Sequence, residues 1–269
     1  MSAIGYLFPG QGAQAVGMGK AFYDRFDEAK AVYQRAKKRL GFDIAALCFE
    51  GPAEELTKTE KCQPALFVTS LAAFAAFKRV VPASLAPVAS AGLSLGELTA
   101  LAVAEAFSPE DGFYLVQARG EAMAECAAHH RGAMLAVIGL ANEAIEAICR
   151  TSGAVGANYN AADQVVLSGT VEAIEQAEAL AKAQSAKRAI RLEVAGAFHS
   201  PLMQPAADAF KTALAKVQIK PPVFPVVSKV TGEGVSDPDK IRELLVKQIV
   251  SPVRWEASVR AIERMLAVV

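Results

Sequence analysis

The chain has no excess charge of either sign, no paired cysteine motif and very little histidine or tryptophan. Its 28 basic residues balance 28 acidic ones, so the net charge at pH 7 is zero. A protein whose main partner is a nucleic acid usually carries a clear basic excess, which argues against that class. The four cysteines, Cys48, Cys62, Cys126 and Cys149, are scattered without a C-x-x-C pair. We therefore expect reduced, buried thiols, and neither a metal site nor a disulfide framework.

The sequence pattern shows no signal peptide and no run that could span a membrane. Its first residues lack a basic region and soon meet Pro9 and Gly10, unlike a secretory signal. The longest uncharged stretch, 80–96, contains Pro82 and Pro87 together with several serines. With 53% hydrophobic and 21% charged residues, the chain of 269 residues is globular in composition. We therefore expect a cytoplasmic protein with one large domain, or a large domain that carries a smaller insert.

The segment 91–97 predicts the end of a strand, a sharp turn and the start of a helix. The residues before the turn, 88–93, are apolar or small, and leucines follow it at helical spacing. Residues 92–96 read Gly-Leu-Ser-Leu-Gly, which fits the G-x-S-x-G nucleophile elbow. Such an elbow presents its serine, here Ser94, at the head of a helix, where free N–H groups favour negative charge. The pattern alone also fits a plain strand–helix turn, so residues elsewhere have to decide.

An elbow serine needs a base, and the chain offers three histidines. His129 and His130 are adjacent and lie next to charged residues, which is typical of a surface loop. His199 follows a predicted strand and precedes a helix that Pro201 would open. A histidine in that place can have a structural role, but His199 is the best candidate for the base.

A charged side chain stands on the helix predicted from 108 to about 127. Its start is marked by a serine cap, a proline and two acids. Arg119 and Met123 lie four residues apart and therefore share one face of this helix. Taken by itself, Arg119 is typical of a solvent-exposed helix arginine.

The N-terminus predicts a short strand, 4–8, that runs into a glycine-rich loop around Gln11. No Gly-Lys-Ser/Thr follows, and the third glycine of a dinucleotide fingerprint is missing, so we set aside phosphate or nucleotide binding by this loop. The loop is either a plain turn or a segment whose backbone N–H groups face a ligand. Further on, the pattern predicts helices at 20–40 and 65–77, the latter with Pro64 at its first position. A last strand within 221–228 and helices at 240–248 and from 257 onward complete the chain.

Residues 133–194 change in character and predict the order β-α-β-β-α-β. That order is typical of a ferredoxin-like unit. We expect an α/β fold in which an α/β-hydrolase-like catalytic subdomain, 1–130 and 197–269, has a parallel sheet and the nucleophile elbow. A ferredoxin-like subdomain, 131–196, is inserted in it. The expected strands of this insert are 134–139, 155–159, 164–168 and 189–194, and its helices are 142–149 and 171–184.

Taken together and in order, the motifs resemble those of malonyl-CoA:acyl-carrier-protein transacylases of fatty-acid synthesis and of polyketide synthase acyltransferase domains. The resemblance covers nearly the whole chain. Two departures stand out: the family usually has His where this chain has Leu93, and it usually continues beyond Val269. The matching segments are the loop 8–14, Gln63-Pro64-Ala65, the elbow 92–97, Arg119 with Gly120 and Met123, Asn158-Tyr159-Asn160, Gln164-Val165-Val166, the histidine motif 196–203, and Gln248 with 252–255.

The resemblance implies ping-pong transfer of a malonyl group through a serine ester. Ser94 would be the nucleophile and His199 the base, and the backbone N–H groups of Gln11 and Leu95 would form the oxyanion hole. A backbone carbonyl near Gln248 would orient the histidine in place of an acidic residue. Such an acid is not required, because a thiolate is a good leaving group and its departure needs less assistance from the base.

The same resemblance assigns the substrate contacts. Arg119 would grip the malonyl carboxylate with two parallel hydrogen bonds. Gln63, Met123 and Asn160 would contribute to substrate binding, and the bulky Phe198 would leave little room for a methyl branch.

No metal or resident organic cofactor is implied, because phosphopantetheine belongs to the carrier partner. The implied partners are malonyl-CoA and acyl carrier protein, and we expect a monomer that binds neither nucleic acid nor membranes. Two alternatives stay open. A discrete polyketide acyltransferase would share all of this chemistry, and an acyl-thioester hydrolase would share Ser94 and His199 without needing Arg119.

Overall fold

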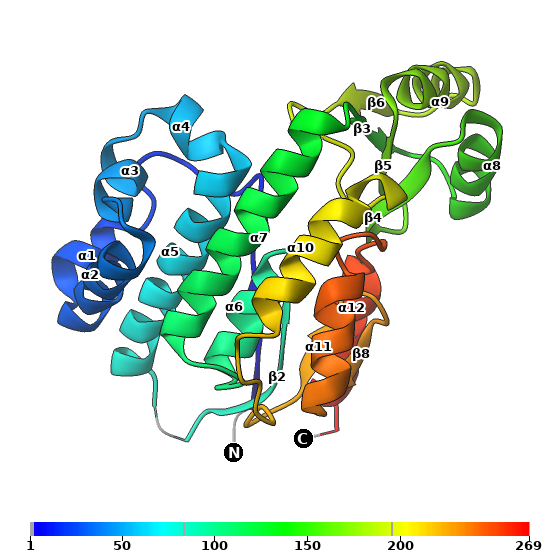
Figure 1. Cartoon of the computed structure of the whole chain (residues 1–269). Helices are drawn as coiled ribbons and strands as arrows, with labels where there is room; N and C mark the ends of the chain where they lie inside the picture. The colour runs from blue at the N-terminus through cyan, green and yellow to red at the C-terminus, as the bar shows by residue number, and fades with distance from the viewer. Residues whose placement is uncertain (1–2, 83, 195, 269) are drawn as a thin grey trace.

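The computed structural model describes residues 3–82, 84–194 and 196–268, which form a large part and a smaller one (Figure 1). The sheet of the large part has the strand order β1-β2-β7-β8. Its first three strands are parallel and β8 is antiparallel. Phe8 pairs with Gly92, so β1 and β2 end together, and the loops that follow them leave the same edge. The strands are β1 (Ala3–Phe8), β2 (Ala86–Gly92), β7 (Val226–Ser228) and β8 (Glu233–Val235).

Helices enclose this sheet because their apolar faces pack on it and on each other. The long helices α5 and α7 lie side by side, and the T-shaped pair of Phe67 and Phe113, with ring centroids 5.9 Å apart, sits between them. No helix among the described residues is both long and apolar enough to cross a membrane. The helices are α1 (Lys20–Arg25), α2 (Asp27–Leu40), α3 (Ile44–Glu50), α4 (Ala53–Thr57), α5 (Thr59–Val80), α6 (Gly96–Val103), α7 (Pro109–His129), α10 (Gln204–Leu214), α11 (Pro238–Lys247) and α12 (Trp255–Leu266).

The smaller part is an antiparallel four-stranded sheet in the order β4-β5-β3-β6 with two helices. This order and the sequence of elements are those of a ferredoxin-like unit, as the sequence predicts. Its buried residues form a hydrophobic core of their own. The elements are β3 (Ala133–Ile138), α8 (Asn142–Ser152), β4 (Val155–Ala161), β5 (Gln164–Gly169), α9 (Val171–Ala183) and β6 (Arg188–Arg191).

A short backbone bridge ties the two parts together. Asn158 of β4 forms a parallel bridge with Val253 of the segment between α11 and α12. The Tyr159 N–H donates to the Val253 carbonyl over 2.9 Å, and the Val253 N–H donates to the Ala157 carbonyl over 2.8 Å. The small sheet is therefore attached directly to the segment that follows α11.

Several element boundaries differ from those that the sequence predicts. Pro64 lies inside α5, which begins at Thr59, so the prediction of Pro64 at the first helical position is wrong. Phe26 is extended and separates α1 from α2, where one continuous helix is predicted. Only Val226–Ser228 of the predicted strand 221–228 is a strand, because prolines cannot donate to a sheet ladder. Strand β8 carries no periodic apolar pattern and is absent from the prediction.

Candidate active site

Ser94 lies in the sharp turn between β2 and α6, in a strained backbone conformation. Its φ is +53°, in the left-handed region that side chains other than glycine rarely adopt. The two glycines of the motif make room for this turn. A Cβ on Gly92 would lie 1.8 Å from the Gly96 carbonyl carbon, and one on Gly96 would lie 2.6 Å from the Phe8 carbonyl oxygen. The turn has the geometry of a nucleophile elbow, which holds the hydroxyl at the head of α6.

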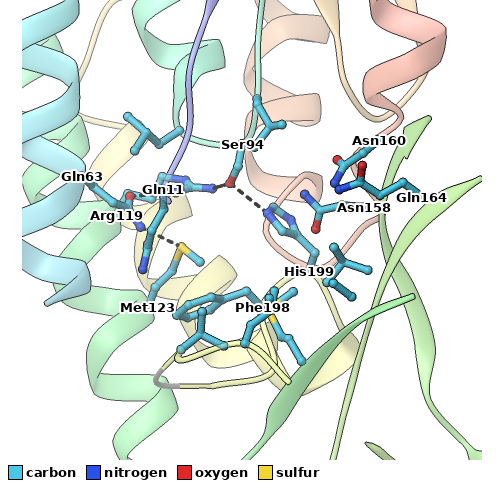
Figure 2. Close-up of a pocket in the computed structure, with 17 residues that line it drawn as sticks. Gln11, Gln63, Ser94, Arg119, Met123, Asn158, Asn160, Gln164, Phe198 and His199 are labelled. Atoms are coloured by element: carbon cyan, nitrogen blue, oxygen red, sulfur yellow. Dashed lines mark hydrogen bonds between the residues drawn. The ribbon is translucent and has the colours of Figure 1, made fainter. Parts of the chain in front are cut away.

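Ser94 and His199 form a hydrogen-bonded dyad (Figure 2). The Ser94 Oγ is 2.8 Å from the His199 Nε2. The other ring nitrogen, Nδ1, lies 2.9 Å from the Gln248 backbone carbonyl, an acceptor that requires a proton on Nδ1. Nε2 is then the unprotonated nitrogen of a neutral ring and can accept the serine proton. The structure thus places His199 as the partner of Ser94, while His129 is exposed at the end of α7.

The surroundings of His199 keep its ring neutral. Burial lowers its pKa to about 3, and the positive charges of Arg119 and Lys229 act in the same direction, whereas the hydrogen bond that Nδ1 donates to the Gln248 carbonyl opposes the shift. A base has to be unprotonated before it can accept a proton, so this environment favours the reactive form throughout the neutral pH range.

Arg119 is fully buried beside the nucleophile, and it is not the solvent-exposed arginine that its helix position by itself suggests. Its guanidinium donates to the Gln63 Oε1 over 2.7 Å, and to the Ser94 Oγ and the Gln248 Oε1 over 3.0 Å each. Burial lowers its pKa to about 10, so the group is charged at pH 7. No carboxylate pairs with Arg119 in residues 3–82, 84–194 or 196–268, and its Nε has no partner there. A buried cation in this state is suited to an anionic ligand.

The dyad opens into a cavity of about 300 Å³ between the two parts of the chain. The large part contributes Leu93 beside the serine, and an apolar wall comes from the small sheet and the segment after it. Carboxamide side chains of β4 and β5 face the dyad, and the Asn160 Oδ1 is buried with no hydrogen-bond partner in the described part of the chain. The predicted site residues that line this cavity are Gln11, Gln63, Ser94, Leu95, Arg119, Met123, Asn160, Phe198 and His199.

The candidate oxyanion donors lie at the two loops that leave β1 and β2. Gln11 and Leu95 both line the cavity. In the part of the chain that the structure describes, neither backbone N–H donates to another backbone group. Gln248 does not line the cavity; it lies behind His199 and Arg119 and contacts both, through its carbonyl oxygen and its side chain respectively.

The site also contains two charged residues to which the sequence analysis gives no role. Lys229 and Glu97 form a buried ion pair behind the Ser94 turn. Glu97 belongs to the elbow motif, but nothing in the sequence pairs it with a lysine far along the chain. The one signal for Lys229 is a charged residue placed directly after a short buried strand.

The family of acyl transferase domains matches residues 5–269. The chain belongs to this acyl transferase family. The malonyl CoA-acyl carrier protein transacylase of Bacillus subtilis is 43% identical over 264 residues, which are 96% of this chain and 82% of that protein. The acyl-carrier-protein S-malonyltransferase structure from Bartonella henselae is 38% identical, covers 98% of this chain and 85% of its own, and has a TM-score of 0.93.

A further acyl transferase structure is a malonyl-transacylase in complex with its acyl-carrier protein from a type II polyketide synthase. It is 37% identical, covers 98% of this chain and 86% of its own, and has a TM-score of 0.93. The two-part α/β fold of this acyl transferase is therefore shared with solved structures over almost its whole length.

Proposed function

We propose that this chain transfers a malonyl group from malonyl-CoA to the phosphopantetheine thiol of an acyl carrier protein, through an ester on Ser94. The observation that carries the proposal is the buried Arg119 cation, which lies within hydrogen-bonding distance of the nucleophile and has no carboxylate partner among the described residues. A hydrolase or a transferase of neutral acyl groups would have no use for such a cation. The names of the acyl transferase relatives agree with this assignment.

The first half-reaction follows from the dyad geometry. As the Ser94 Oγ attacks the thioester carbonyl carbon, its proton passes to the His199 Nε2. The carbonyl oxygen becomes an oxyanion, which the N–H groups of Gln11 and Leu95 would bind. The C–S bond then breaks, and the CoA thiolate takes the proton back from His199. The carbonyl of Gln248 keeps the ring oriented during both transfers.

The second half-reaction is the reverse with a different thiol. The carrier thiol gives its proton to His199 and attacks the Ser94 ester, and the Ser94 oxygen leaves and regains the proton. Arg119 holds the malonyl carboxylate through both halves, because a planar guanidinium can grip it with two hydrogen bonds.

We further propose that the enzyme needs no metal or resident organic cofactor and acts as a cytoplasmic monomer that binds neither nucleic acid nor membranes. The acyl group is carried by Ser94 itself, and each thiol is brought in by its own substrate. Fatty-acid synthesis is the favoured setting. A polyketide carrier is a second candidate, because one of the similar structures is a complex with such a carrier.

Intact mass after brief mixing with malonyl-CoA tests the proposal. The wild type should gain the mass of one malonyl group, and Ser94→Ala should gain none, because the ester has lost its oxygen. Adding an acyl carrier protein should move the malonyl group onto that carrier, and comparing a fatty-acid carrier with a polyketide carrier should separate the two settings. Steady release of CoA without a mass gain would identify a hydrolase instead.

Replacing Phe198 should relax selectivity against branched acyl groups. Its ring lines the cavity and is buried. Phe198→Ala opens space for an α-methyl group, and we expect methylmalonyl transfer to rise about tenfold or more relative to malonyl transfer. Competition between the two CoA esters, read by mass, measures this ratio. Phe198→Leu should give a smaller change. An unchanged ratio in the folded Phe198→Ala variant would show that another residue limits the space for the methyl branch.

A further inference from the structure

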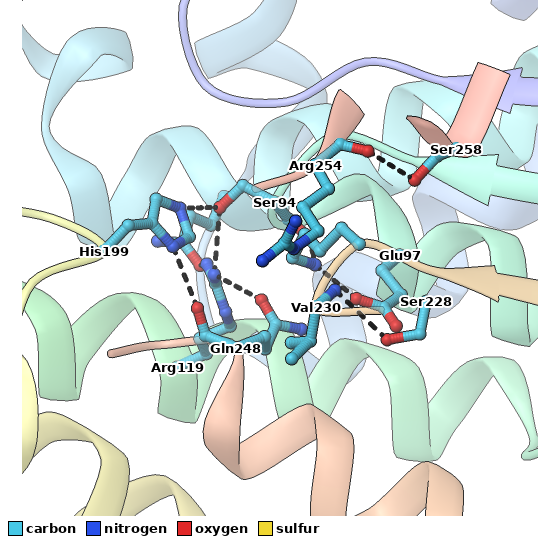
Figure 3. A network of polar contacts seen from close by, with 11 residues as sticks. Ser94, Glu97, Arg119, His199, Ser228, Val230, Gln248, Arg254 and Ser258 are labelled. Carbon is cyan, nitrogen blue, oxygen red and sulfur yellow. Dashed lines mark hydrogen bonds and ion pairs between the residues drawn. The ribbon is translucent and has the colours of Figure 1, made fainter. Parts of the chain in front are cut away.

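An ion pair that the proposed mechanism does not use lies behind the nucleophile. Lys229 follows β7, and Glu97 is in the first turn of α6. The Lys229 Nζ is 2.5 Å from the Glu97 Oε2, and the two side chains are 1% and 4% exposed. In Figure 3, Glu97 and His199 appear on opposite sides of Ser94. Removing two charges from water is costly, and apolar residues of similar size often stabilise a core as well, so stability alone does not account for the pair.

The lysine also contacts the backbone of the elbow. Its Nζ donates to the Ser94 carbonyl oxygen over 2.5 Å, and the same oxygen accepts the Glu97 N–H over 3.2 Å. This carbonyl and the N–H of Leu95 belong to one peptide unit. In a trans peptide they point in opposite directions. A cation on the carbonyl side therefore leaves the Leu95 N–H facing away from Lys229, and Leu95 lines the cavity.

We propose that Lys229 is a positioning residue for the oxyanion site: its ammonium, held by Glu97, fixes and polarises the Ser94–Leu95 peptide so that the Leu95 N–H becomes a stronger donor. This inference rests on the acyl transfer proposed above. A cation at a carbonyl oxygen draws electron density from the amide, and hydrogen bonds in such a chain strengthen one another. The contact also holds the peptide that follows the left-handed Ser94 in one orientation.

The charge that this role requires is present at neutral pH. Burial lowers the pKa of Lys229 to about 8, and the negative charge of Glu97 opposes that shift. The nearby Arg119 adds to the lowering. The ammonium form therefore predominates at pH 7, the condition for the experiment below.

The expected effect is on the chemical step, because an oxyanion forms only in the transition state. Losing one oxyanion donor outright costs roughly 100- to 1000-fold in kcat, so weakening one should cost about 10-fold, with KM nearly unchanged. The loss should be equal for malonyl-CoA and acetyl-CoA, because both substrates develop the same oxyanion. A change that acts on the malonyl carboxylate would affect malonyl-CoA alone.

The experiment measures single-turnover acylation at pH 7 with both CoA esters, together with steady-state kcat and KM. The main variant is the double substitution Glu97→Gln with Lys229→Met, which removes both charges and keeps similar volumes. Glu97→Gln alone, which frees the ammonium from its anchor, is the second variant. Lys220→Met is the matched control, because Lys220 is exposed. Thermal unfolding shows which variants are folded.

We expect both Glu97 variants to lose acylation by about 10-fold with either ester, while Lys220→Met behaves as wild type. A folded double variant with wild-type kcat would overturn the proposal. So would a loss confined to malonyl-CoA, or a loss that disappears at higher pH, which would place the effect on His199. If the wild type itself gains no malonyl group, the proposed function fails, and that result is separate from the comparison among variants.

Discussion

Replacing His199 by alanine should slow acylation of Ser94 by about 100- to 10,000-fold, while malonyl-CoA still binds. General-base assistance to a positioned nucleophile is worth this much, and no other described side chain is placed to replace it. The Gln248 carbonyl that orients the ring would lose its partner, but its backbone position belongs to a buried segment. Stopped-flow release of CoA in a single turnover measures the rate, and intact mass shows whether the ester forms at all.

The burial of His199 also predicts how the acylation rate depends on pH. Because burial and two cations hold the pKa of His199 near 3, the ring is neutral down to acidic pH and loses a proton-accepting nitrogen only as the pH approaches that value. Acylation in the wild type should therefore stay constant as pH falls from 7 to about 5, where an ordinary histidine of pKa about 6.5 would lose most of its activity. A drop centred near pH 6.5 would contradict the buried geometry. Ser94→Ala combined with His199→Ala should be no slower than Ser94→Ala alone, because the base has no function once the nucleophile is gone.

Replacing Arg119 by alanine should invert the preference for malonyl over acetyl groups. The malonyl carboxylate would lose its buried partner, which is worth roughly 2–5 kcal/mol in comparable charged pairs, so malonyl transfer should fall by about 30-fold or more. Acetyl transfer loses no charge contact in this variant. The Ser94 Oγ also no longer accepts a hydrogen bond from Arg119. It should hold steady or rise.

The measurement is the ratio of kcat/KM for malonyl-CoA and acetyl-CoA in wild type and variant. Arg119→Lys is an informative second variant, because lysine keeps the charge but cannot donate two parallel hydrogen bonds to the carboxylate. We expect it to bind malonyl-CoA better than the alanine variant and worse than wild type. Full malonyl preference in Arg119→Ala would refute the assignment of Arg119 as the carboxylate partner.

The parts of the fold that depend on local signals were accessible from the sequence. The elbow is predictable because two glycines with a serine between them leave room for a strained turn at Ser94. The ferredoxin-like unit is predictable because its alternating strands and helices follow one another without long connections. Strand β8 was not predictable from the sequence, because it has only three residues and depends on pairing with β7 rather than on an apolar pattern of its own.

Burial of charge could not be read from the sequence. Arg119 stands on a helix with charged neighbours, and only the packing of α5 beside α7 shows that it lies wholly inside. The pair of Lys229 and Glu97 joins residues 132 positions apart, so no local pattern reveals it. Pro64 misled the prediction of a helix start because proline is tolerated near the first turn, and α5 begins at Thr59 instead.

The backbone bridge between β4 and Val253 connects one wall of the cavity with the segment that orients His199. The strand that presents Asn158 and Asn160 to the cavity is tied to Val253, and a short segment leads from there back to Gln248, whose carbonyl aligns the base. We therefore expect a displacement of the small sheet to act, through that segment and Gln248, on the alignment of His199 with Ser94. A substrate that binds against β4 should therefore also favour the aligned arrangement of Ser94 and His199.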